Sequence, residues 1–169
     1  MSPINVRKEQ PEDIPAIREL TTAAFKESAE ADIVDNIRKH HKDALSLVAT
    51  RDEKVVGHIL FSPVIIECGK KKVKGMALGP MAVAPEEQRK GIGTELVRAG
   101  ISRMRGRSIP YVVLVGHPDF YPRFGFERAS RRGITCKWDV PDDVFMILIL
   151  HDPTMLGVTG QAQFVPEFA

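Results

Sequence analysis

The sequence predicts one α+β domain: a mixed, mostly antiparallel sheet flanked by helices, with one parallel βαβ crossover. Two patterns lead to this class. Strand-like stretches separated by short polar turns follow one another in residues 45–83, as in an antiparallel meander. Residues 73–115 then give strand, helix and strand, and the two strands of such a unit are parallel. The length of 169 residues fits one domain.

The N-terminal part of the chain is predicted to form one strand and two helices. Residues 4–7 are expected to form an edge strand. Apolar residues recur at helical spacing in residues 14–25, directly after the acidic pair Glu12 and Asp13, whose charge suits a helix start. Residues 31–39 carry the same spacing over a shorter length, so a second helix is expected there.

The meander follows these helices. Residues 45–50 and 55–66 are predicted strands joined by a polar turn, and residues 73–83 form the next strand after a turn at residues 68–71. Pro63 lies inside the second of these strands, where a proline suggests a bulge or bend.

The crossover and the last strand complete the sheet. A helix is expected to begin near Gly93, and residues 111–115 form a nearly continuous apolar run, typical of a strand buried on both faces. Residues 144–150 are the last predicted strand. We therefore place the domain at residues 1–150 and expect residues 151–169 to be a tail packed on it.

Composition narrows the class of protein further. Lysine and arginine number 24 against 22 aspartates and glutamates, and a net charge of +2 argues against a surface built for nucleic acid. Cys68 and Cys136 are too few for a disulfide scaffold or a four-thiolate zinc site, and no metal site is expected. No stretch reaches the ~20 apolar residues of a membrane span, and no signal peptide is visible. We expect a cytoplasmic protein that does not enter the membrane.

The loop before the crossover helix carries the clearest chemical signal. Gly91 and Gly93 allow the backbone to approach a ligand closely, and the N–H groups of a helix start favour anions. Arg89 and Lys90 add positive charge, so the loop predicts a phosphate or pyrophosphate site. The dinucleotide pattern G-x-G-x-x-G fails because Leu96 stands where its third glycine belongs. The alternative is that the glycines serve only tight packing of the helix.

This loop resembles a family signature. Gln88-Arg-Lys-Gly91-Ile-Gly93 is similar to the Gln/Arg-x-x-Gly-x-Gly/Ala motif of the GCN5-related N-acetyltransferases, the GNAT family. Residues 79–85 resemble the splayed fourth strand of that family, and residues 120–126, Phe-Tyr-Pro-Arg-Phe-Gly-Phe, resemble its later tyrosine segment. The patterns are closest to the subgroup of predicted acetyltransferases of the YhbS type. The resemblance covers about residues 4–150. It implies a GNAT-type fold, acetyl-coenzyme A (acetyl-CoA) as donor and an amine as acceptor.

The resemblance also implies which residues bind the donor. Backbone N–H groups would hold the pyrophosphate of coenzyme A (CoA) along Gln88, Arg89, Lys90, Gly91, Ile92, Gly93 and Thr94. Met81 and Val83 are two residues apart, so their backbone groups face the same way. They would pair with the pantetheine arm and polarise the acetyl carbonyl. Arg123 can reach a phosphate of the cofactor, or it is a solvated surface charge. The asparagine that many relatives carry before the tyrosine is absent from residues 115–119.

Three residues are candidates for the chemistry. Tyr121 matches the tyrosine that protonates the departing thiolate, and with an ordinary pKa of ~10 it is protonated at neutral pH. Its alternative role is packing among the neighbouring phenylalanines. Glu30 can orient or deprotonate the amine, or only supply charge at a helix start. His117 can act as a base or be an ordinary loop residue. His58, on a strand, is expected to be a core residue.

Three functions compete at this point. The first is an N-acetyltransferase in which the amine attacks acetyl-CoA directly in a ternary complex. The second is a catalytically inactive module of the same fold that senses acyl-CoA. The third is nucleic-acid binding through the basic run at residues 70–74, which lacks interleaved aromatic residues. The acceptor stays open between metabolites, antibiotics, protein N-termini and lysine side chains, and the sequence leaves a homodimer open.

Overall fold

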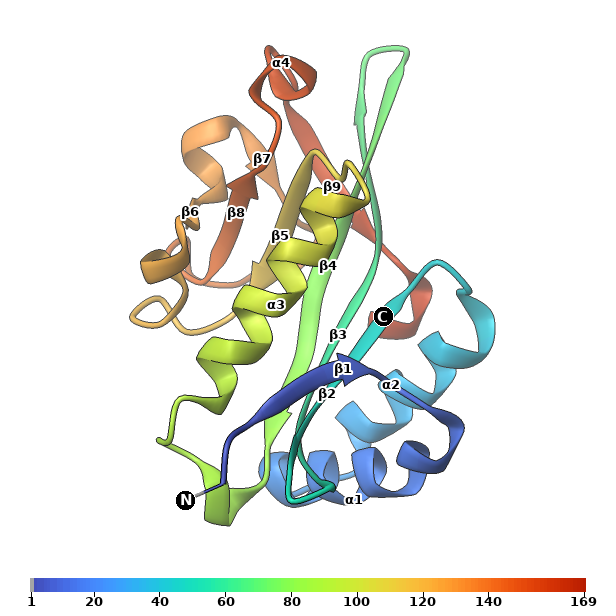
Figure 1. Cartoon of the computed structure of the whole chain (residues 1–169). Coiled ribbons are helices and arrows are strands. Elements are labelled where there is room, and N and C mark those ends of the chain that lie inside the picture. The colour runs from blue at the N-terminus through green and yellow to red at the C-terminus, as the bar shows by residue number, and fades with distance from the viewer. Residues whose placement is uncertain (1) are drawn as a thin grey trace.

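The computed structural model describes residues 2–169 and contains a nine-stranded mixed sheet flanked by helices (Figure 1). The strands are β1 (Asn5–Lys8), β2 (Leu45–Arg51), β3 (Lys54–Cys68), β4 (Lys71–Val83), β5 (Tyr111–Val115), β6 (Glu127–Arg128), β7 (Ile134–Thr135), β8 (Phe145–Ile149) and β9 (Gly160–Phe164). The helices are α1 (Ile14–Phe25), α2 (Ala29–His40), α3 (Ile92–Gly106) and α4 (Asp152–Met155). Short 3-10 turns are η1 (Pro11–Asp13), η2 (Pro85–Glu87), η3 (Tyr121–Phe124), η4 (Ala129–Arg132) and η5 (Pro166–Phe168).

The strand order confirms the predicted α+β class. The main path of the sheet runs β1-β2-β3-β4-β5-β8-β6, and β9 pairs with β3 and β7. Along that path only β4 and β5 are parallel, and α3 is the helix that connects them. This is the predicted βαβ crossover.

The two faces of the sheet are covered by different helices. Side chains alternate along a strand, so Leu47 of β2 packs in the cluster that contains Leu96 of α3. Its neighbour Val48 points the other way and packs with Ile17 of α1 and Val34 of α2. Figure 1 shows α3, in yellow-green, lying diagonally across the sheet, and α1 and α2, in blue and cyan, grouped together at the lower right.

The ladder between β3 and β4 is irregular at one point, and the extra residue there belongs to β4. The register shift falls between Ile59 and Phe61 of β3, where Gly79 and Pro80 of β4 together oppose Leu60. Gly79 has a φ of 131°, a backbone conformation that side-chain-bearing residues rarely adopt, and Pro80 has no N–H to donate to a ladder. Both residues therefore suit a bulge, which bends the strand at this point.

The bulge predicted at Pro63 is therefore wrong. Pro63 pairs in regular register with Met76 of β4. On the other side of β3, the ladder with β2 ends at Phe61 and the ladder with β9 begins at Val64. Pro63 falls between these two ladders, where a missing N–H interrupts neither of them.

Residues 151–169 contain more regular structure than the expected tail. They form α4, β9 and η5, and β9 pairs antiparallel with residues 64–66 of β3. Val165 is buried together with residues of α1 and α2. The end of the chain thus covers the face of the sheet opposite α3.

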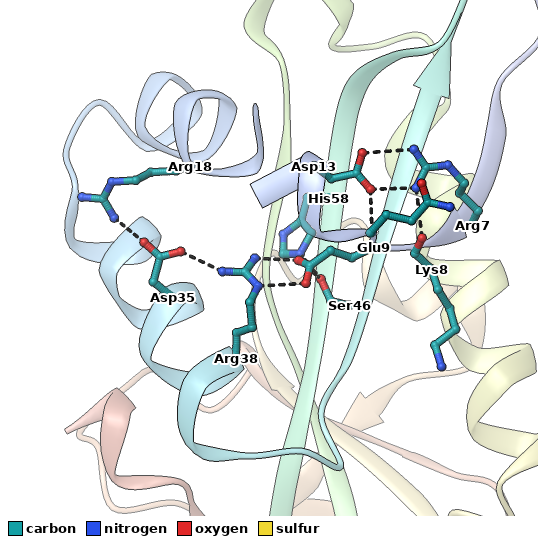
Figure 2. A network of polar contacts seen from close by, with 10 residues as sticks. Arg7, Lys8, Glu9, Asp13, Arg18, Asp35, Arg38, Ser46 and His58 are labelled. Atoms are coloured by element: carbon teal, nitrogen blue, oxygen red, sulfur yellow. Dashed lines mark hydrogen bonds and ion pairs between the residues drawn. The ribbon is translucent and has the colours of Figure 1, made fainter. Parts of the chain in front are cut away.

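A half-buried polar network joins β2, β3 and α2 to the segment after β1 (Figure 2). Arg38 donates two hydrogen bonds to the carboxylate of Glu9, with N···O distances of 2.8 and 2.6 Å. The Ser46 hydroxyl donates to Glu9 at 2.7 Å and lies 2.7 Å from Nε2 of His58. Because the single proton of that hydroxyl goes to Glu9, we assign Nε2 of His58 as a donor to Ser46.

The network explains the protonation states of its members. His58 is 1% exposed, as expected for a core residue, and burial lowers its pKa to about 4. Burial raises the pKa of Glu9, but hydrogen bonds from Arg38 and Ser46 outweigh it, and the net pKa is lowered. The folded protein therefore carries a neutral His58 and an ionised Glu9 at neutral pH.

His58 should make the fold sensitive to acid. Unfolded histidine titrates near ~6.5, so between pH ~6.5 and about 4 the unfolded chain binds a proton that the folded chain excludes. The free energy of unfolding should therefore fall by about 3 kcal/mol as the pH drops through this window. The variant His58→Gln keeps a hydrogen-bond donor for Ser46. Urea denaturation of this variant should show a free energy of unfolding that depends less on pH. The exposed His151→Gln is the control, and equal slopes in wild type and His58→Gln would refute this assignment.

Candidate functional site

The candidate site lies where β4 and β5 separate. The two strands pair only at Met76 with Val112 and at Ala77 with Val113. Beyond these pairs, and past the bulge in β4, a cavity of about 620 Å³ opens on the carboxyl-terminal side of both strands. From β4 it is lined by Leu78, Gly79, Pro80, Met81, Ala82 and Val83.

The edge of β4 presents backbone groups to this cavity that no neighbouring strand pairs with. The N–H of Ala84 donates to the carbonyl of Val56 in β3 at 2.9 Å. Backbone groups alternate in direction along a strand, so those of Met81 and Val83 face away from β3. No strand of residues 2–169 pairs with β4 at these positions on that side. An extended ligand can therefore pair with this edge as an added strand.

The start of α3 provides a second set of free donors beside this edge. Gly91 caps the helix with a φ of 86°, which favours glycine, and the first helical hydrogen bond runs from the N–H of Glu95 to the Gly91 carbonyl at 3.1 Å. The helix itself thus leaves the N–H groups of Ile92, Gly93 and Thr94 free. Together with the helix dipole they make a candidate anion site.

Gly93 shows that this anion site adjoins the cavity. A Cβ at Gly93 would lie 3.5 Å from Cε of Met81 and 3.7 Å from Cζ of Phe120. The helix start, the edge of β4 and the aromatic segment after β5 therefore meet at one point.

The side chains of the loop before α3 differ in whether they line the cavity. The Gln88 amide lines the cavity and donates to the carbonyl of Val83 at 3.1 Å. Arg89 is exposed, and Nζ of Lys90 lies 3.8 Å from a carboxylate oxygen of Glu87. Arg89, Lys90 and Thr94 flank the helix start without lining the cavity.

Tyr121 lines the cavity with a largely buried side chain. It is 7% exposed, and its ring packs edge-on against Phe120 and Phe126, with centroid separations of 5.0 and 5.8 Å. A Cβ at Gly116 would lie 2.6 Å from Cε2 of Tyr121, so the ring needs a glycine there. Burial raises the pKa of Tyr121 to about 12. No hydrogen-bond partner in the described part of the chain engages its hydroxyl, which therefore keeps its proton for a ligand.

Glu30 and His117 line the same cavity as Tyr121. Glu30, at the start of α2, is half-buried, and burial together with the neighbouring Glu27 raises its pKa. His117 follows β5, and its carbonyl accepts the N–H of Phe120 at 3.2 Å. The structure thus brings the three predicted catalytic candidates around one space.

Arg123 lies outside this cavity. Its guanidinium stacks over the ring of Phe120 at 4.7 Å from the centroid. It shares a separate shallow hollow with Arg98 and Arg105 of α3. Arg123 can therefore make the predicted phosphate contact only with a ligand that extends beyond the cavity and the start of α3.

Four aromatic residues on the far side of the cavity were not predicted from the sequence. They are Phe25, Trp138, Phe164 and Phe168, which we call the aromatic wall. They come from the end of α1, the segment after β7, β9 and η5. Trp138 is the single tryptophan of the chain, and this was the one feature of the sequence that could have drawn attention to the aromatic wall.

Within residues 2–169, no group of three or more histidine, cysteine, aspartate or glutamate residues lies close enough together to hold a metal ion. None of the helices combines the length and apolar character needed to cross a bilayer.

Comparisons with known proteins agree with this geometry. The family model described as "Acetyltransferase (GNAT) domain" matches residues 5–129. "Uncharacterized N-acetyltransferase YhbS" of Escherichia coli strain K12 is 35% identical over 164 residues, covering 96% of this chain and 97% of that protein.

Two solved structures are similar over nearly the whole chain. The crystal structure of Escherichia coli YhbS in complex with CoA has a TM-score of 0.91 and 32% identity, and covers 99% of this chain and 93% of that one. A GNAT family acetyltransferase from Brucella melitensis in complex with acetyl-CoA has a TM-score of 0.79 and 33% identity, with 100% of both chains covered.

Proposed function

This chain belongs to the GNAT family of acetyltransferases, and we propose that it transfers the acetyl group of acetyl-CoA to a primary amine by direct attack. The observation that carries this proposal is the unpaired edge of β4 beside the free N–H groups of α3. A strand edge next to an anion site matches a ligand with an amide-containing arm attached to a pyrophosphate. CoA has this construction, and two similar proteins were solved with CoA and with acetyl-CoA.

Each part of acetyl-CoA has a counterpart in the site. The N–H groups from Gly91 to Thr94 would bind the pyrophosphate, with Arg89 and Lys90 adding positive charge. The pantetheine arm would pair with Met81 and Val83, and an N–H on this edge would polarise the acetyl carbonyl and stabilise the oxyanion. Arg123, with Arg98 and Arg105 beside it, would attract a phosphate of the adenosine end.

The proposed reaction needs no covalent enzyme intermediate. The neutral amine attacks the thioester carbonyl, a C–N bond forms, and the C–S bond breaks. Glu30 or His117 takes the amine proton, directly or through water, and the raised pKa of Glu30 makes it a stronger base than an ordinary glutamate. Tyr121 gives its proton to the leaving thiolate. Because acetyl-CoA is made inside cells, we also propose a cytoplasmic location.

Acetyl-CoA should stabilise the folded protein. A ligand at 100 times its dissociation constant adds about 2.7 kcal/mol, which raises Tm by roughly 5–10 °C for a domain of this size. Thermal unfolding with millimolar CoA or acetyl-CoA measures this shift, and no shift would contradict the assignment of the donor.

Thiol release with a broad panel of amines then tests acetyl transfer itself. Release that depends on an added amine supports the enzyme. Stabilisation by acetyl-CoA without release for any amine would identify the chain as a sensing module of the same fold.

A further inference from the structure

The half of the cavity beyond the reactive groups is apolar and aromatic. Phe25 closes it from the end of α1, Trp138 from the segment after β7, and Phe164 and Phe168 from the last strand and turn of the chain. Ile33 and Val140 also line the cavity. With acetyl-CoA along β4 as proposed, this apolar part of the cavity remains for an acceptor.

Three of the four rings of the aromatic wall contact one another in the structure. The rings of Trp138 and Phe164 meet edge to face, with centroids 4.8 Å apart and planes inclined by 70°. Phe164 and Phe168 do the same at 5.8 Å and 86°. Since these rings hold one another in place, a planar apolar ligand meets a preformed surface with little ordering cost.

Exposed apolar side chains mark the same cavity. Within residues 2–169, the large hydrophobic side chains that are exposed are Phe25 at 39%, Val115 at 44% and Leu156 at 84%. Phe25 and Val115 both line the cavity, whereas Leu156 lies elsewhere. Exposed apolar groups gathered at one opening favour an apolar partner.

The charges of the cavity restrict its ligand further. Glu30 is the single carboxylate among the lining residues, and no lysine or arginine lines the cavity. No ion pair within residues 2–169 neutralises Glu30. A half-buried carboxylate without a cationic partner favours a positive charge on the ligand. The Lys137 ammonium lies over the Trp138 ring, 5.3 Å from its centroid, but Lys137 does not line the cavity, so a ligand carboxylate meets no cation among the lining residues.

From these features we infer that the acceptor is a small primary amine carried on an aromatic ring, with one positive charge and no acidic group. Its ring would pack against the aromatic wall and its ammonium group would bind Glu30 before losing a proton. The inference rests on the proposed function, because it names the acceptor of that reaction. It disfavours amino acids, which carry a carboxylate, and polyamines and aminoglycosides, which carry several positive charges.

Trp138 allows acceptor binding to be measured without turnover. It is the only tryptophan, so selective excitation reports on the aromatic wall alone. With free CoA present, we expect phenethylamine to change this fluorescence in a saturable way. Its dissociation constant should be about tenfold or more below those of phenylalanine, which adds a carboxylate, and butylamine, which lacks the ring. Spermidine should bind no better than butylamine.

Variants separate the contributions of ring and charge. Phe168→Leu should raise KM for phenethylamine several-fold and leave KM for butylamine unchanged, because only the ring contacts are lost. Glu30→Gln should weaken binding of both amines. Leu156→Ser, outside the cavity, should match wild type, and an unchanged thermal shift with acetyl-CoA checks that each variant is folded.

The outcomes distinguish this inference from the proposed function. Phenylalanine or spermidine binding as tightly as phenethylamine, or no fluorescence response to aromatic amines, would overturn the inference. Acetyl-CoA stabilisation and thiol release with another amine would then still support the acetyltransferase. Aromatic amine binding without any acetyl-CoA binding would contradict the proposed function, and the cavity would then be an aromatic-amine site with no acetyl group to transfer.

Discussion

Replacing Tyr121 with phenylalanine should slow acetyl transfer roughly 10²–10⁴-fold while acetyl-CoA still binds. Only the hydroxyl is removed, and the ring can keep its contacts with Phe120 and Phe126. With a pKa of about 12 the hydroxyl is protonated at working pH, so the variant loses a general acid. The rate should be measured under single-turnover conditions, so that the chemical step limits it.

The way in which the rate loss varies with the acyl donor shows whether Tyr121 acts as a general acid. The loss should be smaller for acyl donors whose thiols leave easily as anions, whereas a residue that only shapes the pocket would slow every donor alike. Tyr111→Phe is the matched control, because its hydroxyl donates to the carbonyl of Val73 at 2.8 Å, away from the cavity. Unchanged turnover of Tyr121→Phe with acetyl-CoA would leave protonation of the thiolate to water or His117.

Gly93→Asp should abolish CoA binding without unfolding the protein. A carboxylate about 4 Å from a pyrophosphate charge weakens binding by roughly two to three orders of magnitude. The fold should survive, because a Cβ at Gly93 makes only ordinary contacts and an acidic residue suits the first turn of a helix. Gly91→Asp is less clean, because the φ of 86° at Gly91 strains any side chain.

Gly93→Asn separates charge from size in this experiment. Asparagine has nearly the shape of aspartate but no charge. Calorimetric titration should therefore show that Gly93→Asn binds CoA more weakly than the wild type does but more strongly than Gly93→Asp does. Wild-type affinity in Gly93→Asp would mean that the pyrophosphate binds elsewhere on the protein.

The sequence was most informative where local patterns decide the structure. The bounds of α1 were predicted because apolar residues recur at helical spacing, and β5 was predicted from a continuous apolar run. The anion site could be predicted because Gly91 and Gly93 lie in the loop and helix start that form it. Its backbone donors depend on that local geometry alone.

Features set by distant contacts could not be predicted in this way. Strand β9 has the sequence Gly-Gln-Ala-Gln-Phe, which lacks a strong apolar pattern and becomes a strand by pairing with β3. The presence of a proline in a predicted strand could not show that Pro63 falls between two ladders. It also could not show that the bulge lies at Gly79 and Pro80.

The aromatic wall was missed for the same reason. Its four residues come from positions 25, 138, 164 and 168, and no sequence spacing relates them. They meet because the last residues of the chain fold back across the sheet beside α1 and α2. The aromatic wall is therefore a product of tertiary structure, whereas the free N–H groups at the start of α3 follow from one loop.

A crystal structure of the protein with bound CoA tests the central claim most directly. We predict that the pantetheine arm lies along Met81 and Val83, with the pyrophosphate on the N–H groups from Gly91 to Thr94. The sulfur atom should then lie within hydrogen-bonding distance of the Tyr121 hydroxyl. Well-ordered CoA with its pyrophosphate away from the start of α3, or with its sulfur out of reach of Tyr121, would contradict the account.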